Sequence, residues 1–463
     1  MKELDLVLTG GKIVLPDSVI DASVGIADGK IVFISANGWV PKAREVVDLA
    51  GKVVFPGFID THVHFRDPGL TYKEDFTTGS RAAAAGGITT VVDMPNNKPV
   101  INKTEHFVAK RDDAAKKSIV DFALYAGATD LDEIPGMLGA GAIGVKIFMV
   151  ADPKSGYPHD PALFTGNDGM LYDTLRTAKR EGTYCAVHPT NQEIFAHESK
   201  KKWDAGTTTP DDFVEAYFGE NCVSDHTAMA TLIEMSRASG THVHILHLRS
   251  ETGIKIIQHA KDEGLNLTME VNPKYFLHTA EDMKRMGPLC TPYGLPDSVR
   301  ANIKKEVERG TVDVLGSDHA PHSRQELEPG WKDAWSIPFG NPQLDHYVSA
   351  LLTCVNEGTF SLRTLARTLA ENPAKLIGVF PKKGAIRIGS DADFTIVDLA
   401  ARGTFDDKNL GTKVQWSPYT GRAYTGRPVM TIVRGNVVMR DGTVTGQPGG
   451  GQFVNGQELR KEK

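Results

Sequence analysis

In the stretch Gly57-Phe-Ile-Asp-Thr-His-Val-His-Phe-Arg-Asp-Pro-Gly69, two histidines stand one residue apart within a short apolar run. Side chains alternate faces along an extended strand, so His62 and His64 point the same way. Proline and glycine bound the run on both sides, which places the pair where a strand gives way to a loop. Two imidazoles on one face can bind one metal ion, although an isolated His-x-His is more often a hydrogen-bonded core pair.

Further apolar strands follow this stretch, and helical or loop segments separate them. They are Thr89–Asp93, Asp121–Tyr125, Gly144–Phe148, Tyr184–His188, His242–His247, Asn266–Glu270 and Val312–Gly316. Strands that alternate with helices imply a parallel sheet, and this many units predict a closed (β/α)8 barrel of the TIM type. Barrel active sites lie at the C-terminal ends of the strands, and the histidine pair falls at such an end.

Both ends of the chain are rich in short β runs instead. They are Leu6–Leu8, Lys12–Leu15, Val24–Ile26 and Lys30–Phe33 at the start, and Ala385–Ile388, Asp393–Asp398, Val429–Val433 and Asn436–Met439 near the end. We therefore predict an α/β protein in which residues 1–54 and 382–445 form one small β-sandwich domain and residues 55–381 form the catalytic barrel. The tail, 446–463, has no periodic pattern, and we expect it to be mobile or to lie over a neighbouring subunit.

Composition narrows the class of protein. The 463 residues carry a net charge of −6, which disfavours nucleic acid as a partner because phosphate binding needs a basic surface. The four cysteines form no CxxC pair, which is typical of a reducing compartment. A basic leader and a long apolar span are both missing, so we expect a cytoplasmic protein with no membrane partner.

Lys146 lies in the apolar run Gly144–Phe148, where a bare ammonium would be costly to bury. An ion pair or a side chain that reaches solvent would keep the charge. Carboxylation by carbon dioxide would instead turn Lys146 into an anionic ligand that bridges two metal ions. The residues leave both interpretations open.

Two more histidines end predicted strands, His188 and His247. Each alone is more often a hydrogen-bonded strand-end residue than a ligand. His242 and His244 share one face of the same strand as His247, but His247 lies nearest the C-terminal rim. We therefore predict His247 as a metal ligand and the other two as structural or supporting residues.

Asp318 follows an apolar strand in Leu315-Gly-Ser-Asp-His-Ala-Pro-His322. A lone Asp before His usually means a turn or a helix cap. With metal ligands opposite, Asp318 could be both a ligand and the base that handles the proton of a bridging water. Imidazole and carboxylate ligands suit zinc, although manganese, iron or cobalt could occupy the same set.

Taken together, these six residues resemble the two-metal site of the cyclic amidohydrolases, the group that holds hydantoinases, dihydropyrimidinases, allantoinases and dihydroorotases. The likeness covers nearly the whole chain and includes Gly79–Thr90, Asn372–Lys375, Gly389–Asp393 and Trp416–Tyr419. It implies two divalent cations, Zn2+ above all, a carboxylated Lys146, and a homodimer or homotetramer. It also implies that a metal-bridging hydroxide attacks an endocyclic amide carbonyl, while Asp318 takes the proton and returns it to the leaving nitrogen.

Residues around this site divide between branches of the group. Arg66, Asn96 and His322 resemble the dihydroorotase residues that hold the substrate carboxylate, although Arg66 could equally form a loop ion pair. Against this, Cys290–Asp297 lacks the Asn and Arg of the dihydroorotase segment, and Glu328–Trp335 looks closer to an L-selective hydantoinase. The stretch Phe148–Asp152 also lacks the tyrosine that D-hydantoinases carry there.

Three functions follow, in order of preference. The first is a hydantoinase-like or allantoinase-like enzyme that opens a cyclic ureide, a small-molecule substrate. The second is a dihydroorotase that interconverts dihydroorotate and carbamoyl aspartate. The third is a non-catalytic scaffold, which would be expected to have lost metal ligands, whereas all six candidate positions are filled.

Overall fold

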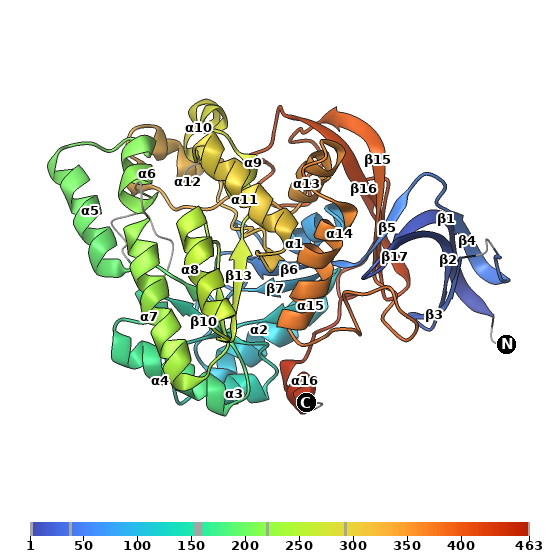
Figure 1. The fold of residues 1–463 in the computed structure, drawn as a ribbon, viewed down its shortest axis with the longest axis horizontal. Helices are drawn as coiled ribbons and strands as arrows, with labels where there is room; N and C mark the ends of the chain where they lie inside the picture. The colour runs from blue at the N-terminus through green and yellow to red at the C-terminus, as the bar shows by residue number, and fades with distance from the viewer. Residues whose placement is uncertain (1–2, 37–38, 152–159, 219–221, 291–293, 462–463) are drawn as a thin grey trace.

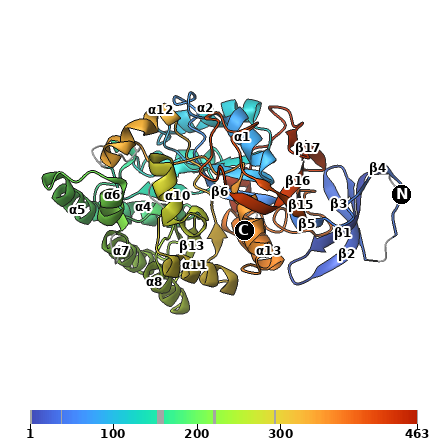
Figure 2. The same ribbon diagram turned by 90° about the horizontal axis from the view of Figure 1, so that it is seen from above.

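The computed structural model describes residues 3–36, 39–151, 160–218, 222–290 and 294–461. Parallel strands lie at the centre of the larger part of the molecule, with helices around them (Figure 1). A separate sheet, built from both ends of the chain, lies at one end of the long axis. Helices α5 and α6 lie at the other end, as the view from above also shows (Figure 2).

The central strands form a three-stranded and a six-stranded parallel sheet. In chain order they are β6 (Phe58–Val63), β7 (Ile88–Asp93), β8 (Asp121–Leu124), β9 (Ala126–Gly127), β10 (Val145–Phe148), β11 (Cys185–His188), β12 (Val243–Ile245), β13 (Leu267–Val271) and β14 (Val314–Leu315). All but a few of their residues are buried, as expected of parallel strands with both faces covered. The predicted parallel α/β core is confirmed.

Backbone contacts connect the two parallel sheets at both of their edges. Only Tyr125 separates β8 from β9, so one chain segment serves the three-stranded sheet first and the six-stranded sheet next. At the other edge, the His64 amide donates to the carbonyl of His319 at 2.8 Å, just beyond β14. These contacts bring the first and last parallel strands close together.

Helices fill most of the connections between the strands. They are α1 (Phe76–Ala85), α2 (Thr104–Lys117), α3 (Ile134–Gly139), α4 (Asp168–Arg180), α5 (Gln192–Asp204), α6 (Pro210–Phe218), α7 (Val223–Ser239), α8 (Glu251–Asp262), α9 (Lys274–Leu277), α10 (Ala280–Met286), α11 (Asp297–Arg309), α12 (Arg324–Leu327), α13 (Tyr347–Asn356), α14 (Leu362–Ala366) and α15 (Asn372–Leu376). Short 3-10 helices cover Pro161–Leu163, Gly287–Leu289, Glu328–Trp331 and Ala334–Ser336, and a π-helical turn covers Arg367–Glu371. Helix α1 begins at a capping box, in which Asp75 and Thr78 satisfy each other's backbone N–H groups.

Both chain ends contribute strands to one nine-stranded sheet. Its strands are β1 (Leu4–Val14), β2 (Val19–Ala27), β3 (Lys30–Ser35), β4 (Ala43–Asp48), β5 (Val53–Pro56), β15 (Phe394–Thr404), β16 (Ala423–Val433), β17 (Asn436–Arg440) and β18 (Thr443–Val444). The two ends meet where β5 pairs antiparallel with β15, with Val54 opposite Ile396. Their apolar side chains share one buried cluster. The chain ends therefore form one unit although more than 300 residues separate β5 from β15.

Two details of this sheet differ from the sequence prediction. The first two predicted runs form one strand, β1, which stays continuous through an irregularity between Leu8 and Gly11. The run Ala385–Ile388 is not a strand, although Ala385 and Ile386 are buried. Glycines with a left-handed backbone bound this run, Gly384 with φ 80° and Gly389 with φ 93°. The run therefore lies in a turn and forms no strand pairing.

The tail prediction was wrong for the described residues, which end at Lys461. The tail returns to its own chain, where the Val454 amide donates to the Phe122 carbonyl at 2.7 Å and the rings of Phe122 and Phe453 lie 5.5 Å apart. Helix α16 (Gly456–Lys461) then packs near α3. Backbone pairing of this kind needs no repeating side-chain pattern, so the sequence carried no signal for it.

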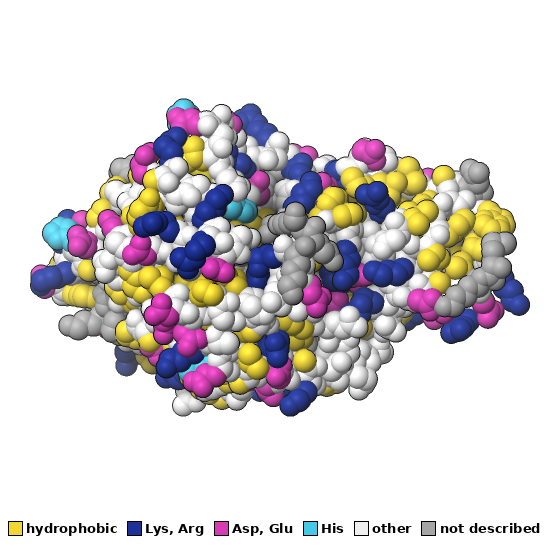
Figure 3. Space-filling model, turned by 90° about the horizontal axis from the view of Figure 1, so that it is seen from below, with side chains coloured by type: hydrophobic (Ala, Val, Ile, Leu, Met, Phe, Trp, Pro, Cys, Tyr) yellow, Lys and Arg dark blue, Asp and Glu magenta, His cyan; other side chains and the backbone are white. Residues whose placement is uncertain are grey.

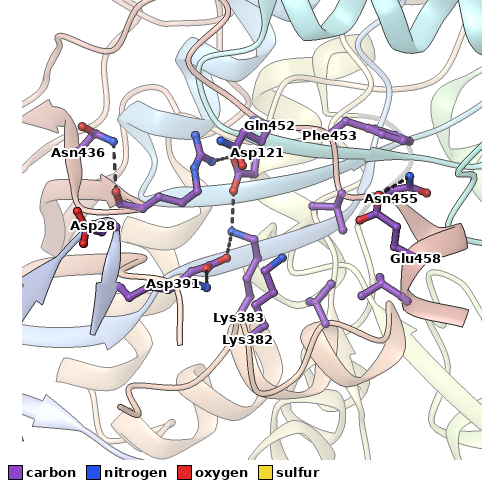
Figure 4. Close-up of a pocket in the computed structure, with 16 residues that line it drawn as sticks. Asp28, Asp121, Lys382, Lys383, Asp391, Asn436, Gln452, Phe453, Asn455 and Glu458 are labelled. Carbon is purple, nitrogen blue, oxygen red and sulfur yellow. Dashed lines mark hydrogen bonds and ion pairs between the residues drawn. The ribbon is translucent and has the colours of Figure 1, made fainter. Parts of the chain in front are cut away.

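A network of buried charges joins the parallel strand β8, the sheet of the chain ends and the tail (Figure 4). The ammonium of Lys383 lies 2.6 Å from carboxylate oxygens of both Asp121 and Asp393 and 3.3 Å from Asp391. Arg434 also pairs with Asp121. Asp121, Lys383, Asp391 and Arg434 line a cavity of about 550 Å³ at the N-terminal end of β8. Each of these buried charges has a partner of opposite charge, as buried ions require.

The surface mixes acidic and basic side chains, and Figure 3 shows one such face. Exposed apolar side chains gather at the end formed by β1 to β4, where Val32, Trp39 and Val46 are 43%, 56% and 50% exposed. Among the described helices, none combines the length and the apolar character that crossing a bilayer would require.

Candidate metal centre

His62 and His64 lie at the C-terminal end of β6, and both imidazoles are oriented by hydrogen bonds. Nδ1 of His62 lies 2.8 Å from Oε1 of Glu270, and Nδ1 of His64 lies 2.6 Å from Oδ1 of Asn96. Both oxygens are acceptors, so each ring donates from Nδ1, which leaves the lone pair of Nε2 available to a metal ion when the ring is neutral. Burial lowers the pKa of His64 to about 3, which keeps that ring neutral.

Asp318 directs one carboxylate oxygen at these two lone pairs. Its Oδ1 lies 3.1 Å from Nε2 of His64 and 3.3 Å from Nε2 of His62. One potential ligand atom from each of the three residues lies within 4.8 Å of the others. With both imidazoles neutral, three acceptors converge here, and a cation among them would relieve their mutual repulsion. The donor set therefore fits a divalent metal ion such as zinc.

His188 and His247 extend this group to the neighbouring strands. His188 is the last residue of β11, and His247 follows β12 by two residues. Nδ1 of His188 and Nε2 of His247 lie 2.8 Å apart, and the rings of His247 and His62 lie 5.7 Å apart. Burial holds the pKa of His247 well below its usual range. The structure thus brings these two predicted residues beside the first histidine pair.

Lys146 on β10 is 1% exposed, and within the described part of the chain its Nζ makes no hydrogen bond. Nζ lies 4.5 Å from the centre of the Phe148 ring. Burial lowers the pKa of Lys146 to about 7, although Asp318 and Glu270 act in the opposite direction. A neutral amine is the form that reacts with carbon dioxide, and this pKa makes part of Lys146 neutral near pH 7. An uncompensated nitrogen at this place fits carboxylation better than a structural lysine.

The predicted substrate residues lie next to this cluster. Nη2 of Arg66 lies 3.1 Å from Nε2 of His322, and both side chains are buried. Nδ1 of His322 lies 2.9 Å from the Lys73 ammonium, so two cations flank one imidazole. Among the described atoms, Nε of Arg66 and Nδ2 of Asn96 are buried donors without an acceptor. An anionic or carbonyl-bearing ligand would satisfy them.

Part of the C-terminal third reaches this region. The Trp416 indole donates to the carbonyl of His322 at 2.8 Å, and the Tyr419 hydroxyl donates to Gln343 at 2.7 Å. Two segments that distinguish the dihydroorotases and the D-hydantoinases in sequence are described only in part. Asp152 and residues 291–293 lie outside the described residues.

Three residues of the site adopt left-handed backbone conformations. The φ values are 61° for Arg66, 42° for His247 and 49° for Asp318. Residues other than glycine rarely take such angles, and each instance costs of order 1 to 3 kcal/mol. Strain of this kind is concentrated at functional sites, and here it turns side chains at strand ends toward one place.

Comparison with known proteins agrees with this geometry. The profile of the amidohydrolase family matches residues 53–438. This chain belongs to the amidohydrolase family. The predicted membership is therefore confirmed, and with it the prediction of a hydrolase.

The similar proteins span several named activities. A dihydroorotase from Methanothermobacter thermautotrophicus is 36% identical over 443 residues, which cover 95% of this chain and 95% of that protein. An allantoinase from Deinococcus radiodurans is 33% identical over 456 residues, covering 96% of this chain and 98% of that protein. The solved structure of the L-hydantoinase from Arthrobacter aurescens has a TM-score of 0.93 at 33% identity, covering 98% of this chain and 100% of that chain.

Sequence reasoning missed two charged residues of this amidohydrolase. Glu270, at the end of β13, accepts from His62, and Lys274, on α9, lies 2.7 Å from Oδ2 of Asp318. Burial acts to raise the pKa of Asp318, but Lys274 and the imidazoles outweigh it and hold that pKa well below its usual range. Position supplied a signal for Glu270, because it ends a predicted strand as the ligand candidates do.

The two histidines set aside from the ligand set, His242 and His244, contact the neighbouring strand of this amidohydrolase. His242 and His244 each place a ring nitrogen 2.9 Å from the Thr268 hydroxyl on β13. Nε2 of His244 lies 3.9 Å from Oε2 of Glu270, which in turn contacts His62. This arrangement supports their prediction as structural or supporting residues.

Proposed function

We propose that this amidohydrolase opens a five-membered cyclic ureide by hydrolysing an endocyclic amide C–N bond, in the manner of a hydantoinase or an allantoinase. The convergence of the Asp318 carboxylate with the Nε2 atoms of His62 and His64 carries the proposal. The L-hydantoinase fold match and the allantoinase relative support this choice of ring.

Two divalent cations, Zn2+ by preference, complete the proposed site. The ligands would be His62, His64, His188, His247, Asp318 and a carboxylated Lys146. When bound, such cations polarise a carbonyl and make water a stronger nucleophile at neutral pH. The orphaned amine of Lys146 and the convergent lone pairs of the histidines support this assignment.

The remaining steps fall to the side chains of the chain. Asp318 accepts the proton of the attacking water and delivers it to the ring nitrogen that leaves. A carboxylate suits both roles because its low pKa keeps it ionised before the attack. Arg66, Asn96 and His322 bind and orient the substrate; Asn96 contacts His64, Arg66 contacts His322, and both Arg66 and Asn96 have a buried donor to offer.

Dihydroorotase activity is the second candidate, and the buried Arg66 favours it. The guanidinium has a donor to spare and could pair with the carboxylate of dihydroorotate. The 36% identical dihydroorotase supports this alternative. A cyclic ureide with an acidic substituent at the same position would satisfy Arg66 equally well.

Larger-scale features belong to the same proposal. The parallel strands form a closed (β/α)8 barrel over residues 55–381, supported by the His64–His319 contact that links its first and last strands. Residues 1–54 and 382–445 form a small sandwich domain. Exposed apolar side chains on β1 to β4 support assembly into a homodimer or homotetramer. The enzyme works in the cytoplasm.

A substrate panel tests the function. The protein, loaded with Zn2+ in the presence of bicarbonate, is offered hydantoins, allantoin, dihydrouracil and dihydroorotate, and ring opening is followed by the loss of ultraviolet absorbance. Turnover of a hydantoin or allantoin above the others is expected. Exclusive turnover of dihydroorotate would establish the second candidate, and no ring opening at all would refute both.

A further inference from the structure

Asp318 uses its two carboxylate oxygens for different contacts. Oδ1 faces Nε2 of His62 and His64, whereas Oδ2 lies 2.7 Å from the Lys274 ammonium and 3.3 Å from the Asn272 amide nitrogen. Both donors to Oδ2 follow directly on β13: Asn272 lies in the connection to α9, and Lys274 is the first residue of α9. One oxygen of the carboxylate is therefore bound by Asn272 and Lys274, and the other faces the histidine cluster.

Lys274 is an unusual residue for this place. Its side chain is 2% exposed, so the ammonium gives up nearly all of its hydration. A buried ion pair is weak evidence for a stabilising role, because desolvation offsets the attraction between the charges. Asp318 also adopts a left-handed φ of 49°. A backbone conformation of this kind persists only where the surrounding contacts hold it in place.

We infer that Lys274 is a positioning residue, which anchors Oδ2 of Asp318 so that Oδ1 alone points at the histidine cluster. The inference rests on the proposed function for its catalytic consequence, but the geometry stands without it. An unanchored carboxylate could rotate and place both oxygens toward a cation. The anchor prevents this rotation and keeps one ligand atom and one orientation for the proton transfer.

The test compares Lys274→Met with a matched control, Lys261→Met. Lys261, near the end of α8, lies 2.7 Å from Asp313, which directly precedes β14 and so lies at the opposite end of that strand from Asp318. In the Lys274→Met holoenzyme, kcat should fall by about 10- to 100-fold with little change in KM, as for other groups that orient a metal ligand. Lys261→Met should leave both constants unchanged.

A spectroscopic readout separates positioning from mere stability. With Co2+ in place of zinc, a switch of Asp318 from one bound oxygen to two raises the coordination number and weakens the visible absorption bands. We expect this change in Lys274→Met and not in Lys261→Met. Lys274→Ala should behave like Lys274→Met, and added ethylammonium should restore part of its kcat by refilling the cavity with a cation.

Each outcome bears on the inference. An unchanged kcat and an unchanged Co2+ spectrum in folded Lys274→Met would overturn it, as would failure of both Lys274 variants to fold, which would assign the residue to stability. If the wild-type protein opens no ring, the proposed function fails. The Co2+ spectra would still decide whether Lys274 anchors the carboxylate.

Discussion

Two Lys–Asp pairs of the same length flank strands β13 and β14, one beyond each end of the strands. Lys261 and Asp313 meet at the N-terminal ends at 2.7 Å, and Lys274 and Asp318 meet at the C-terminal ends at 2.7 Å. Their surroundings differ. The Lys261 side chain is 21% exposed, and Oδ2 of Asp313 also accepts from the Met269 amide.

At the C-terminal end, the carboxylate of Asp318 has acceptors on its other side instead of donors. The Nε2 atoms of His62 and His64 lie 3.3 and 3.1 Å from Oδ1, an arrangement that suits a cation bound among the three residues. The comparison teaches that residue types alone do not mark the function. The function is indicated instead by the convergence of the Asp318 carboxylate with two imidazoles, at the end of the parallel strands where active sites are built.

The largest effect should follow from Asp318→Asn. The amide cannot take a proton from water and is a poorer ligand, so kcat should fall by at least about 10³-fold. Asp313→Asn is the matched control and should keep the wild-type kcat, measured per folded protein by the ring-opening assay. A variant pair with equal activity would remove the distinction between the two ends.

Lys146 should make the regeneration of activity depend on pH. The pKa of Lys146 is lowered to about 7, so the amine is protonated below that pH and neutral above it. Only the neutral amine combines with carbon dioxide. Protein stripped of metal and bicarbonate should therefore recover activity faster as the pH rises through about 7, at constant dissolved carbon dioxide and zinc.

A control variant sharpens this prediction. Lys146→Gln should bind fewer than two equivalents of zinc by metal analysis and should show no dependence on carbon dioxide. Recovery that is equally fast on both sides of pH 7 would argue against carboxylation of this residue.

A smaller effect is expected for Glu270→Gln. The amide keeps the shape but weakens the hydrogen bond that orients His62, so zinc affinity or kcat should fall by about 10- to 100-fold. Competition with a chelator measures the affinity. Zinc affinity equal to that of the wild type would mean that the 2.8 Å contact between Glu270 and His62 does not orient the ring.

The smallest effect belongs to Lys261→Met. Removing a partly exposed ion pair should lower the free energy of unfolding by about 0 to 1 kcal/mol, which thermal or urea unfolding would detect as a small shift. Loss of activity without loss of stability would place this end of the strands in the active site and contradict the comparison.

Several features could be predicted from local patterns. His62 and His64 share a face because side chains alternate along a strand, and Lys146 stood out because a charge among apolar residues is costly. His247 was separated from His242 by its place at the end of the run. In each case the deciding information lay within a few residues.

Other features escaped because their partners are distant in sequence. Glu270 is 208 residues from His62, and Lys274 is 44 residues from Asp318. The tail was misjudged for a related reason, since its contacts with Phe122 run through the backbone and leave no periodic trace. Ala385–Ile388 was misjudged because burial in a turn and burial in a strand select the same apolar residues.

The sequence by itself determined the alternation of strands and helices, the face that each histidine shares, and the resemblance to the amidohydrolases. These follow from periodicities of two and of nearly four residues, which the local chain encodes. Tertiary structure alone decided which lone pairs converge, which oxygen of Asp318 faces them, and where the tail lies. Such contacts depend on strand register and on left-handed loop residues such as His247 and Asp318, which bring together groups that no local pattern relates.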